Sequence, residues 1–177
     1  YIPVDTIYPT ERLNKIINVV NSAFVIDTIE NKINFNKDNI QTSYALDDQI
    51  IYIIFTSGST GEPKGVQITK SAWLDFDVWL SSEFGLSNKS VFMNQAPFSF
   101  DLSVYELTGF LSLGGTIVLN SRDMADAHLD YFERLKKYGC NVWVSTPSFI
   151  SKYLLSNEFN SLSIKDLSIF LFCGEVL

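Results

Sequence analysis

A polar, glycine-rich stretch between two apolar runs constrains this chain most. Residues Thr56–Gly65 are TSGSTGEPKG, with three glycines, four hydroxyl side chains and one lysine. The apolar run Ile50–Phe55 precedes them, and a second β-like run, Val66–Thr69, follows. Glycines let backbone N–H groups turn toward a ligand, and lysine adds a compact cation. The stretch is therefore typical of a loop that binds polyphosphate.

Two other interpretations of this loop compete. Composition alone favours a flexible Gly/Ser turn between two hairpin strands. The common nucleotide loop G-x-x-x-x-G-K-[ST] fits poorly, because Pro63 stands at its second glycine and Gly65 at its Ser/Thr, counting from Gly58. A strand is also expected after the loop, where that template requires a helix. We therefore do not expect a P-loop NTPase.

Alternating apolar runs and amphipathic segments predict an α/β fold with a mostly parallel sheet. Strands are expected at 24–26 (short and buried), 50–55, 66–69, 91–96, 116–119, 141–145 and 169–173. Helices are expected at 11–20 (with Thr10 as cap), 71–84, from about 103 to 113, 126–138 and 146–155, with a short helical turn at 163–167. In the second of these, Ser71 is the expected cap, Gly85 the stop, and Trp73, Phe76 and Trp79/Leu80 the buried face. Residues 27–48 are predicted to be a surface excursion with short extended pieces.

Polar residues follow several expected strands. Thr56–Gly65, Asn94–Asp101, Ser145–Pro147 and Cys173–Glu175 each stand at the end of an apolar run. Ligands of parallel α/β sheets bind beyond the carboxyl ends of the strands. We therefore expect these four stretches to form one composite site.

Composition excludes several classes of function. The 177 residues suffice for one packed domain, and a net charge of −7 with a pI of about 4.6 disfavours nucleic-acid binding. No apolar run is long enough to cross a membrane. Two cysteines make no disulfide framework, and one histidine excludes a multi-histidine metal site, so no protein-held metal is expected. These features suit a cytoplasmic protein. Since the chain starts at Tyr1 without Met, we expect a piece of a longer protein.

Asp101 lies among Phe98, Phe100 and Leu102 at an expected strand-to-helix junction. It could cap the helix, since Asp is favoured there, or it could pair with a substrate ammonium. At about 4 Å and an effective dielectric of about 20, such a pair gains roughly 4 kcal/mol before desolvation. Because the cost of desolvation offsets much of this gain, the main contribution of the pair is specificity. A fatty-acyl or aryl acid has no ammonium and would leave the carboxylate unpaired. Local sequence leaves both interpretations open.

The whole run 56–65 resembles TSGSTG-x-PKG, the signature loop of the adenylate-forming superfamily of acyl-CoA synthetases, luciferases and nonribosomal-peptide adenylation domains. Phe100–Ser103 resembles the F-D-x-S motif of the amino-acid-activating members. Runs 1–5, 94–104, 145–149 and 170–177 resemble the family of D-alanine–D-alanyl carrier protein ligases. This resemblance implies that residues 1–177 are part of one AMP-binding domain, truncated at both ends, with the fold of the superfamily's large N-terminal domain.

The resemblance also implies residue roles. The ATP-binding residues would be Thr56, Ser57, Gly58, Ser59, Thr60, Gly61, Lys64, Gly174, Glu175 and Val176. The substrate-binding residues would be Asp101, Cys173, Leu102, Tyr105, Ser145 and Leu171. Asp101 would pair with the D-alanine ammonium, and Cys173 would lie beside the substrate methyl and contribute to the choice of D over L. The other four would be pocket-wall positions, with bulky Tyr105 keeping the pocket small. Without the resemblance, Cys173 is a small apolar residue at a strand end.

The implied chemistry has two steps. D-alanine would react with ATP to give D-alanyl-AMP and pyrophosphate, with Mg²⁺ bridging the phosphates. The phosphopantetheine thiol of a D-alanyl carrier protein would then take the alanyl group, for D-alanylation of teichoic acids in the cell wall.

Several parts of the family pattern are not found in these 177 residues. They are the Y-G-P-T-E stretch, the ribose-binding Asp and the domain with the adenylation lysine. We therefore expect no principal catalytic residue here, and no useful activity from this piece alone. A nonribosomal-peptide-type adenylation domain for another small amino acid, and an ATP-binding fragment without turnover, are the alternatives. Asp101 argues against an acyl-CoA synthetase.

Overall fold

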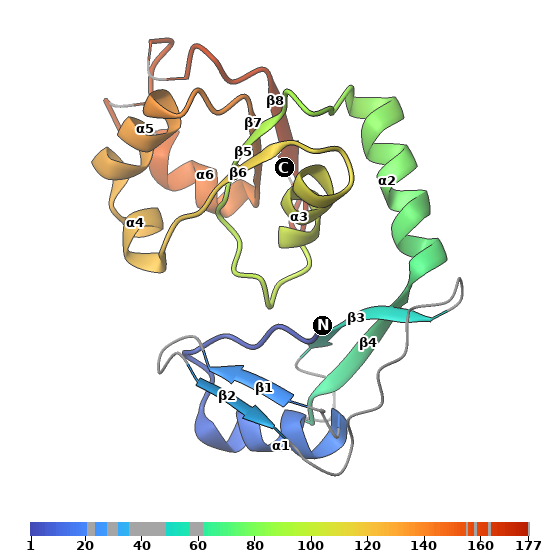
Figure 1. Ribbon diagram of the computed structural model, residues 1–177. Helices are drawn as coiled ribbons and strands as arrows, with labels where there is room; N and C mark the ends of the chain where they lie inside the picture. Colours follow the sequence, from blue (N-terminus) through green and yellow to red (C-terminus); the bar gives the residue numbers. More distant parts are fainter. Residues whose placement is uncertain are drawn as a thin grey trace. The chain divides into compact units, whose positions relative to one another are not determined.

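The structure of the chain, a computed structural model, describes residues 1–20, 24–27, 32–35, 49–56, 62–154, 156–157, 159–162 and 164–176 (Figure 1). The chain packs as two compact units, Tyr1–Ser71 and Ala72–Leu177, which are taken separately below. This division concerns packing within the chain. The boundaries of the AMP-binding domain that we expect over residues 1–177 stay a prediction.

The described part of the first unit holds one helix and two antiparallel strand pairs. Its elements are α1 (Thr10–Val20), β1 (Phe24–Asp27), β2 (Lys32–Phe35), β3 (Ile50–Thr56) and β4 (Lys64–Thr69). β1 pairs with β2, and β3 pairs with β4 in a hairpin. The helix predicted at 11–20 is confirmed, but it begins at Thr10, the residue expected to be its cap, and it buries Ile16. The strand predicted at 24–26 is present as β1, but the expectation that it is buried is wrong, because Ile26 is 59% exposed.

β2 is one of the short extended pieces expected within 27–48. Residues 28–31 and 36–48 lie outside the described part of the chain, so the rest of that prediction has no structural counterpart.

The second unit is built on a four-stranded sheet. Its elements are α2 (Lys70–Phe84, whose first two residues belong to the first unit), β5 (Val91–Met93), α3 (Ser103–Leu111), β6 (Thr116–Val118), α4 (Arg122–Asp126), α5 (His128–Lys137), β7 (Val142–Ser145), α6 (Pro147–Leu154) and β8 (Ile169–Phe172). The strand order is β6-β5-β7-β8, and every neighbouring pair is parallel. The prediction of an α/β fold with a parallel sheet is confirmed.

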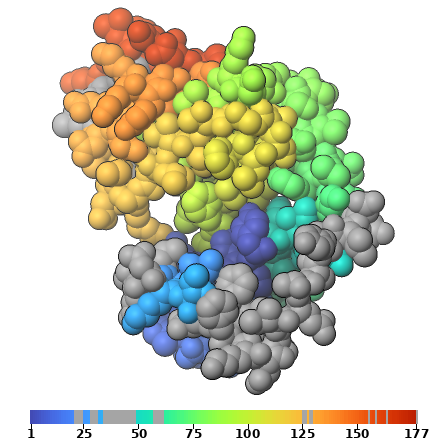
Figure 2. Space-filling model, in the orientation of Figure 1, coloured from blue at the N-terminus to red at the C-terminus, as the bar shows by residue number. Residues whose placement is uncertain are grey.

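Helices cover both faces of this sheet (Figure 1). Met93 and Trp143 point to a core shared with α5 and α6, which contains Tyr131 and Tyr153. The strand residues next to them, Phe92, Val142 and Val144, point the other way, to a core shared with α2 and α3. The buried residues of this second core are Leu80, Leu86, Phe92, Ala96, Leu102, Val142, Val144 and Leu171. This alternation follows from the two-residue period of a strand. Figure 2 shows the yellow atoms of the α3 and β6 region in the middle of the second unit's visible face.

Some predicted boundaries differ from the structure. β5 ends at Met93, three residues early, because Asn94 starts a polar turn. α2 begins at Lys70, so Ser71 lies inside the first turn and is not the cap, and Trp79 is 40% exposed rather than buried. The helix expected at 126–138 is α5, which begins two residues later than predicted and ends at Lys137. A separate helix that was not predicted, α4, precedes it and is capped by the Ser121 hydroxyl.

Prediction for a close helix–strand contact: Gly109→Ala should destabilise the protein. A Cβ atom at Gly109 of α3 would overlap the ring of Phe92 on β5, which is fully buried. We expect overpacking of about 1–3 kcal/mol to exceed the gain in helix propensity of about 1 kcal/mol. Urea unfolding of the full-length protein measures the change.

The matched control is Gly85→Ala, after α2. Its φ is +63° but nothing lies within 4 Å of the added Cβ, so it isolates backbone strain of about 1 kcal/mol. A more stable Gly109→Ala variant would contradict the contact.

Candidate functional site

Three of the four polar stretches lie at one edge of the parallel sheet. Residues 94–101 follow β5, Ser145–Pro147 lies at the end of β7, and residues 173–175 follow β8. β7 stands between β5 and β8, and the Cys173 N–H donates to the Ser145 carbonyl over 3.3 Å. The fourth stretch, 56–65, lies in the first unit between antiparallel strands. The expectation that it follows a strand of the parallel sheet is therefore wrong.

Asp101 stands directly before α3, but it does not cap that helix. The N-cap position is Leu102, and no side chain makes a capping hydrogen bond there. The Asp101 side chain is exposed, and it makes no hydrogen bond or ion pair with any of the described residues. The helix-cap interpretation is wrong, and a carboxylate remains that is open to a cationic partner.

Tyr105 and Cys173 meet beside Asp101. The Tyr105 hydroxyl lies close enough to the Cys173 sulfur for the two groups to affect each other's pKa, which places α3 beside the end of β8. Burial raises the pKa of both groups, and the nearby Asp101 carboxylate raises both further. The contact between the two groups lowers the pKa of Cys173 and raises that of Tyr105. The structure thus brings together three residues that the F-D-x-S resemblance placed around an amino acid.

The remaining wall positions lie in the same part of the unit. Leu102 and Leu171 are buried in the α2/α3 core, and Tyr105 and Cys173 pack against that core. Ser145 is fully buried at the end of β7, where its hydroxyl donates to the Thr146 carbonyl over 3.2 Å. Ser145, Leu102 and Leu171 are thus buried near this edge of the sheet, and the roles of all five residues as pocket-wall positions stay a prediction.

The turn after β8 is fixed through Glu175. Its carboxylate accepts from the Ser148 N–H over 2.9 Å and from the Ser148 hydroxyl over 2.7 Å, so it caps the start of α6. Gly174 has a φ of +88°, a conformation that side chains rarely adopt. Val176 is 95% exposed. With its carboxylate engaged, Glu175 offers a ligand its backbone rather than its charge.

Only the two ends of the predicted phosphate loop are described. Thr56 and Lys64 face each other as partners across the β3/β4 hairpin, and both are exposed. Residues 57–61, which hold Ser57, Gly58, Ser59, Thr60 and Gly61, lie outside the described residues. The hairpin agrees with the expectation that a strand, not a helix, follows the loop.

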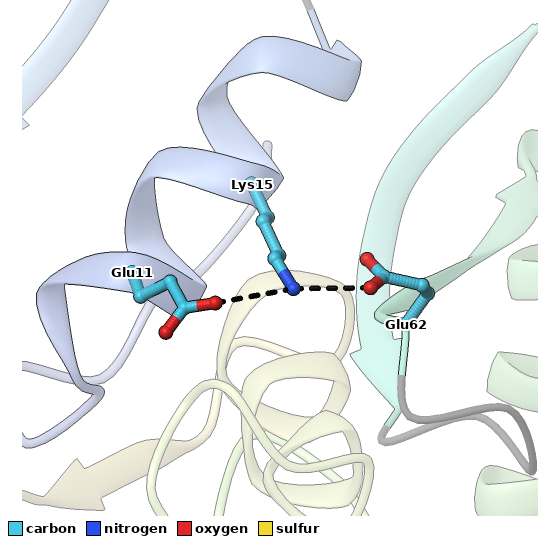
Figure 3. Close-up of polar contacts among 3 residues, drawn as sticks. All are labelled: Glu11, Lys15 and Glu62. Carbon is cyan, nitrogen blue, oxygen red and sulfur yellow. Dashed lines mark hydrogen bonds and ion pairs between the residues drawn. The ribbon is translucent and has the colours of Figure 1, made fainter.

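The loop is also tied to α1 within the first unit, which the sequence did not indicate. The Lys15 ammonium lies between Glu62, at 3.0 Å, and Glu11, at 3.4 Å (Figure 3). Both glutamates are largely exposed and Lys15 is partly exposed, so the pairs contribute little to stability. Lys64, the lysine of the loop itself, forms no ion pair with any described residue.

Glu106 on α3 is a residue that the sequence analysis missed. It is fully buried, and burial raises the pKa of its carboxyl from 4.5 to about 8. The Asn94 amide and the Gln95 N–H donate to its two oxygens, which partly opposes that rise. One signal was available: Glu106 is the one charged residue in the helix Ser103–Leu111.

The described residues contain no group of three or more His, Cys, Asp or Glu side chains that could hold a metal ion. Mg²⁺ is usually bound by substrate phosphates with one or two carboxylates, so such a group is not required. No helix in the described part of the chain is long and apolar enough to cross a membrane.

Residues 31–177 match the family described as AMP-binding enzyme. Two relatives named D-alanine–D-alanyl carrier protein ligase, from Bacillus licheniformis and Staphylococcus aureus, are 39% and 41% identical over 100% of this chain. The chain spans 39% of the length of each relative.

Solved structures share the fold. CmiS6 matches 96% of this chain and 45% of its own with a TM-score of 0.78 at 19% identity. A four-domain nonribosomal peptide synthetase, holo-AB3403 bound to AMP and glycine, matches 100% of this chain and 14% of its own with a TM-score of 0.76 at 23% identity. The α/β fold of the adenylate-forming enzymes is therefore confirmed for this chain.

Prediction for the thiol: Tyr105→Phe should slow alkylation of Cys173. The change removes the hydroxyl that lowers the thiol pKa and leaves burial and Asp101, which raise it. The thiolate is the reactive form, so the rate with iodoacetamide at about pH 8.5 should fall. Mass spectrometry of the Cys173 peptide follows the reaction.

Tyr138→Phe is the control, since Tyr138 is exposed and contacts Arg134 and Lys137 instead. Cys140 is fully buried, burial raises its pKa to about 12, and it serves as an unreactive reference. Equal or faster alkylation of Cys173 in Tyr105→Phe would contradict the contact.

Prediction for pH: stability should fall as pH rises from about 4.5 to about 8. In this window the folded chain keeps the Glu106 proton that the unfolded chain releases, so the loss begins near the ordinary pKa of 4.5 and ends near the raised value of about 8. Urea midpoints of the full-length protein across this range measure the slope.

Glu106→Gln removes the titrating group, so its midpoint should change less across the window, whatever its absolute stability. Glu133→Gln, at an exposed position of α5, should keep the wild-type slope. If Glu106→Gln also keeps the wild-type slope, the pH dependence of stability does not come from Glu106.

Proposed function

Since this chain belongs to the AMP-binding enzyme family, we propose that the full-length protein is a ligase that activates D-alanine with ATP and transfers it to a carrier protein. The observation that carries the proposal is the Asp101 carboxylate, exposed and unpaired among the described residues, beside the Tyr105–Cys173 pair. The two relatives named for D-alanine support the choice of amino acid.

The three side chains match the parts of a small amino acid. Asp101 supplies the negative charge that an ammonium requires, and a hydrogen-bonded ion pair is stronger than a neutral hydrogen bond. The aromatic ring of Tyr105 and the Cys173 sulfur offer an apolar contact that suits a methyl group. Because Tyr105 is bulky and in contact with Cys173, a larger side chain would have to displace this pair.

In the first step, a carboxylate oxygen of D-alanine attacks the α-phosphorus of ATP. The new oxygen–phosphorus bond forms as the bond to the leaving pyrophosphate breaks, giving D-alanyl-AMP. Within this chain, the contribution of Asp101 is to orient the amino acid so that its carboxylate faces the nucleotide.

The loop residues Thr56, Ser57, Gly58, Ser59, Thr60, Gly61 and Lys64 would bind the phosphates, with Lys64 stabilising charge on the leaving group. Gly174, Glu175 and Val176 would present backbone atoms to the adenine. Mg²⁺, bound through the phosphates, would neutralise part of their charge.

In the second step, the phosphopantetheine thiol of a D-alanyl carrier protein attacks the alanyl carbonyl. A thioester forms, AMP leaves, and the thiol proton passes to solvent. The carrier would then supply D-alanine for teichoic acids.

Prediction for substrate choice: the full-length protein should catalyse pyrophosphate exchange with D-alanine in preference to L-alanine, glycine and D-serine. Asp101→Ala should raise the KM for D-alanine by about tenfold or more, because a charged hydrogen bond is lost. The KM for ATP should stay within about twofold, since the change affects only the binding of the amino acid.

Asp130→Asn is the matched control, because Asp130 is an exposed carboxylate in the first turn of α5. Preference for another small amino acid would overturn the D-alanine assignment in favour of a different adenylation domain. ATP binding without pyrophosphate exchange would overturn the ligase itself. An unchanged KM for D-alanine in Asp101→Ala would remove Asp101 from the site.

A further inference from the structure

Among the described residues of the second unit, Glu106 is a fully buried carboxyl group that the proposed function does not use. One oxygen accepts from the Asn94 side-chain amide and the other accepts from the Gln95 N–H over 3.2 Å. Both donors belong to the turn that follows β5. The carboxylate therefore connects α3 to the carboxyl end of a sheet strand by two hydrogen bonds.

The turn is held from its other side as well. The Asn94 amide also donates to the Ala96 carbonyl over 3.0 Å, and its own backbone carbonyl accepts from Asn120 over 2.8 Å. Asn120 is oriented by Arg134 of α5, whose Nε donates to it over 2.8 Å. Residues 94–96 thus have little freedom once Glu106 and Asn120 are in place.

Asp101 lies on the short segment between this turn and α3. The segment folds as consecutive turns, with the Phe100 N–H donating to the Pro97 carbonyl and the Val104 N–H donating to the Asp101 carbonyl. Asp101 makes no side-chain bond of its own to any described residue. Its position is therefore set by the two ends of the segment, and Glu106 joins those ends.

Tyr105 precedes Glu106 on the same helix. Tyr105 contacts Cys173 at the end of β8, and Glu106 contacts the turn after β5. The same turn of α3 is therefore attached to two strand ends at once.

We propose that Glu106 is a positioning residue for the amino-acid substrate, which acts by holding the turn 94–96 against α3 and so sets the places of Asp101 and Tyr105. The inference rests on the proposed function of Asp101. A buried ion or acid is commonly no more stabilising than an apolar residue of its size, so stability alone is a weak reason for a carboxylate here.

Reversal of the hydrogen-bond polarity tests this role. In Glu106→Gln, an NH₂ group would face an N–H donor, either that of Asn94 or that of Gln95. In Asn94→Asp assayed above about pH 8, where Glu106 is ionised, two acceptors would face each other. In the double variant, the introduced glutamine can donate to the introduced aspartate and accept from the Gln95 N–H, so both contacts return and only the bond to Ala96 is lost.

We expect each single change to raise the KM for D-alanine by about tenfold or more, because small displacements of a binding group have large effects on rate. The KM for ATP should stay within about twofold, and the double variant should recover most of the loss. The alkylation rate of Cys173, which senses Tyr105, should change in Glu106→Gln and return in the double variant.

Thr108→Val is the matched control. Thr108 is fully buried two residues further along α3, it accepts from the Trp73 indole over 2.8 Å, and no hydrogen bond of the described residues joins it to residues 94–96. The change should lower stability without altering the ratio of the two KM values. If Glu106→Gln yields too little folded protein, Asn94→Ser removes the same contact from the other side.

The outcomes separate this inference from the proposed function. If the wild type prefers another amino acid, the D-alanine assignment is wrong, and a selective rise in the KM of that amino acid with rescue still supports positioning. Single variants with unchanged KM values and unchanged Cys173 alkylation overturn the inference. The inference is also overturned if the KM values for D-alanine and ATP rise together in proportion to the loss of stability, as for Thr108→Val, and the double variant does not restore them.

Discussion

The arrangement of the second unit depends on parallel pairing of β5, β7 and β8. Parallel neighbours need crossover connections, and these place every carboxyl end at the same edge of the sheet. Three polar stretches that are far apart in sequence therefore meet: one after β5, one at the end of β7 and one after β8. The hydrogen bond from the Cys173 N–H to the Ser145 carbonyl marks this junction. Helices on both faces then bury the strands and leave that edge to ligands.

Two carboxylates near the start of α3 have opposite environments. Asp101 is exposed and unpaired among the described residues, whereas Glu106 is fully buried and accepts two hydrogen bonds. Burial in the core disfavours the charged form, so Glu106 keeps its proton to a higher pH. The exposed group is suited to binding a cation, and the buried group is suited to holding backbone in place.

Sequence patterns predicted the elements well and their details less well. The alternation of apolar runs and amphipathic segments indicated the helices and strands, and Gly85 ended α2 as expected, with a φ of +63°. The exposure of Ile26 and Trp79 was not predicted, because an apolar residue indicates burial only where the fold supplies a partner. The separate helix α4 was missed because it is five residues long and has no apolar periodicity.

The chain's own motifs were enough to indicate the family, and they suggested the substrate class on which the proposed function is based. The ten-residue loop and the F-D-x-S motif are contiguous, so their chemistry is apparent without a structure. Other features depend on contacts between distant segments: Asp101 is not a helix cap, Tyr105 contacts Cys173, Glu175 caps α6, and Glu106 holds the turn after β5. Burial and hydrogen-bond partners are properties of the packed molecule. A local pattern names the residue, and the fold assigns its environment.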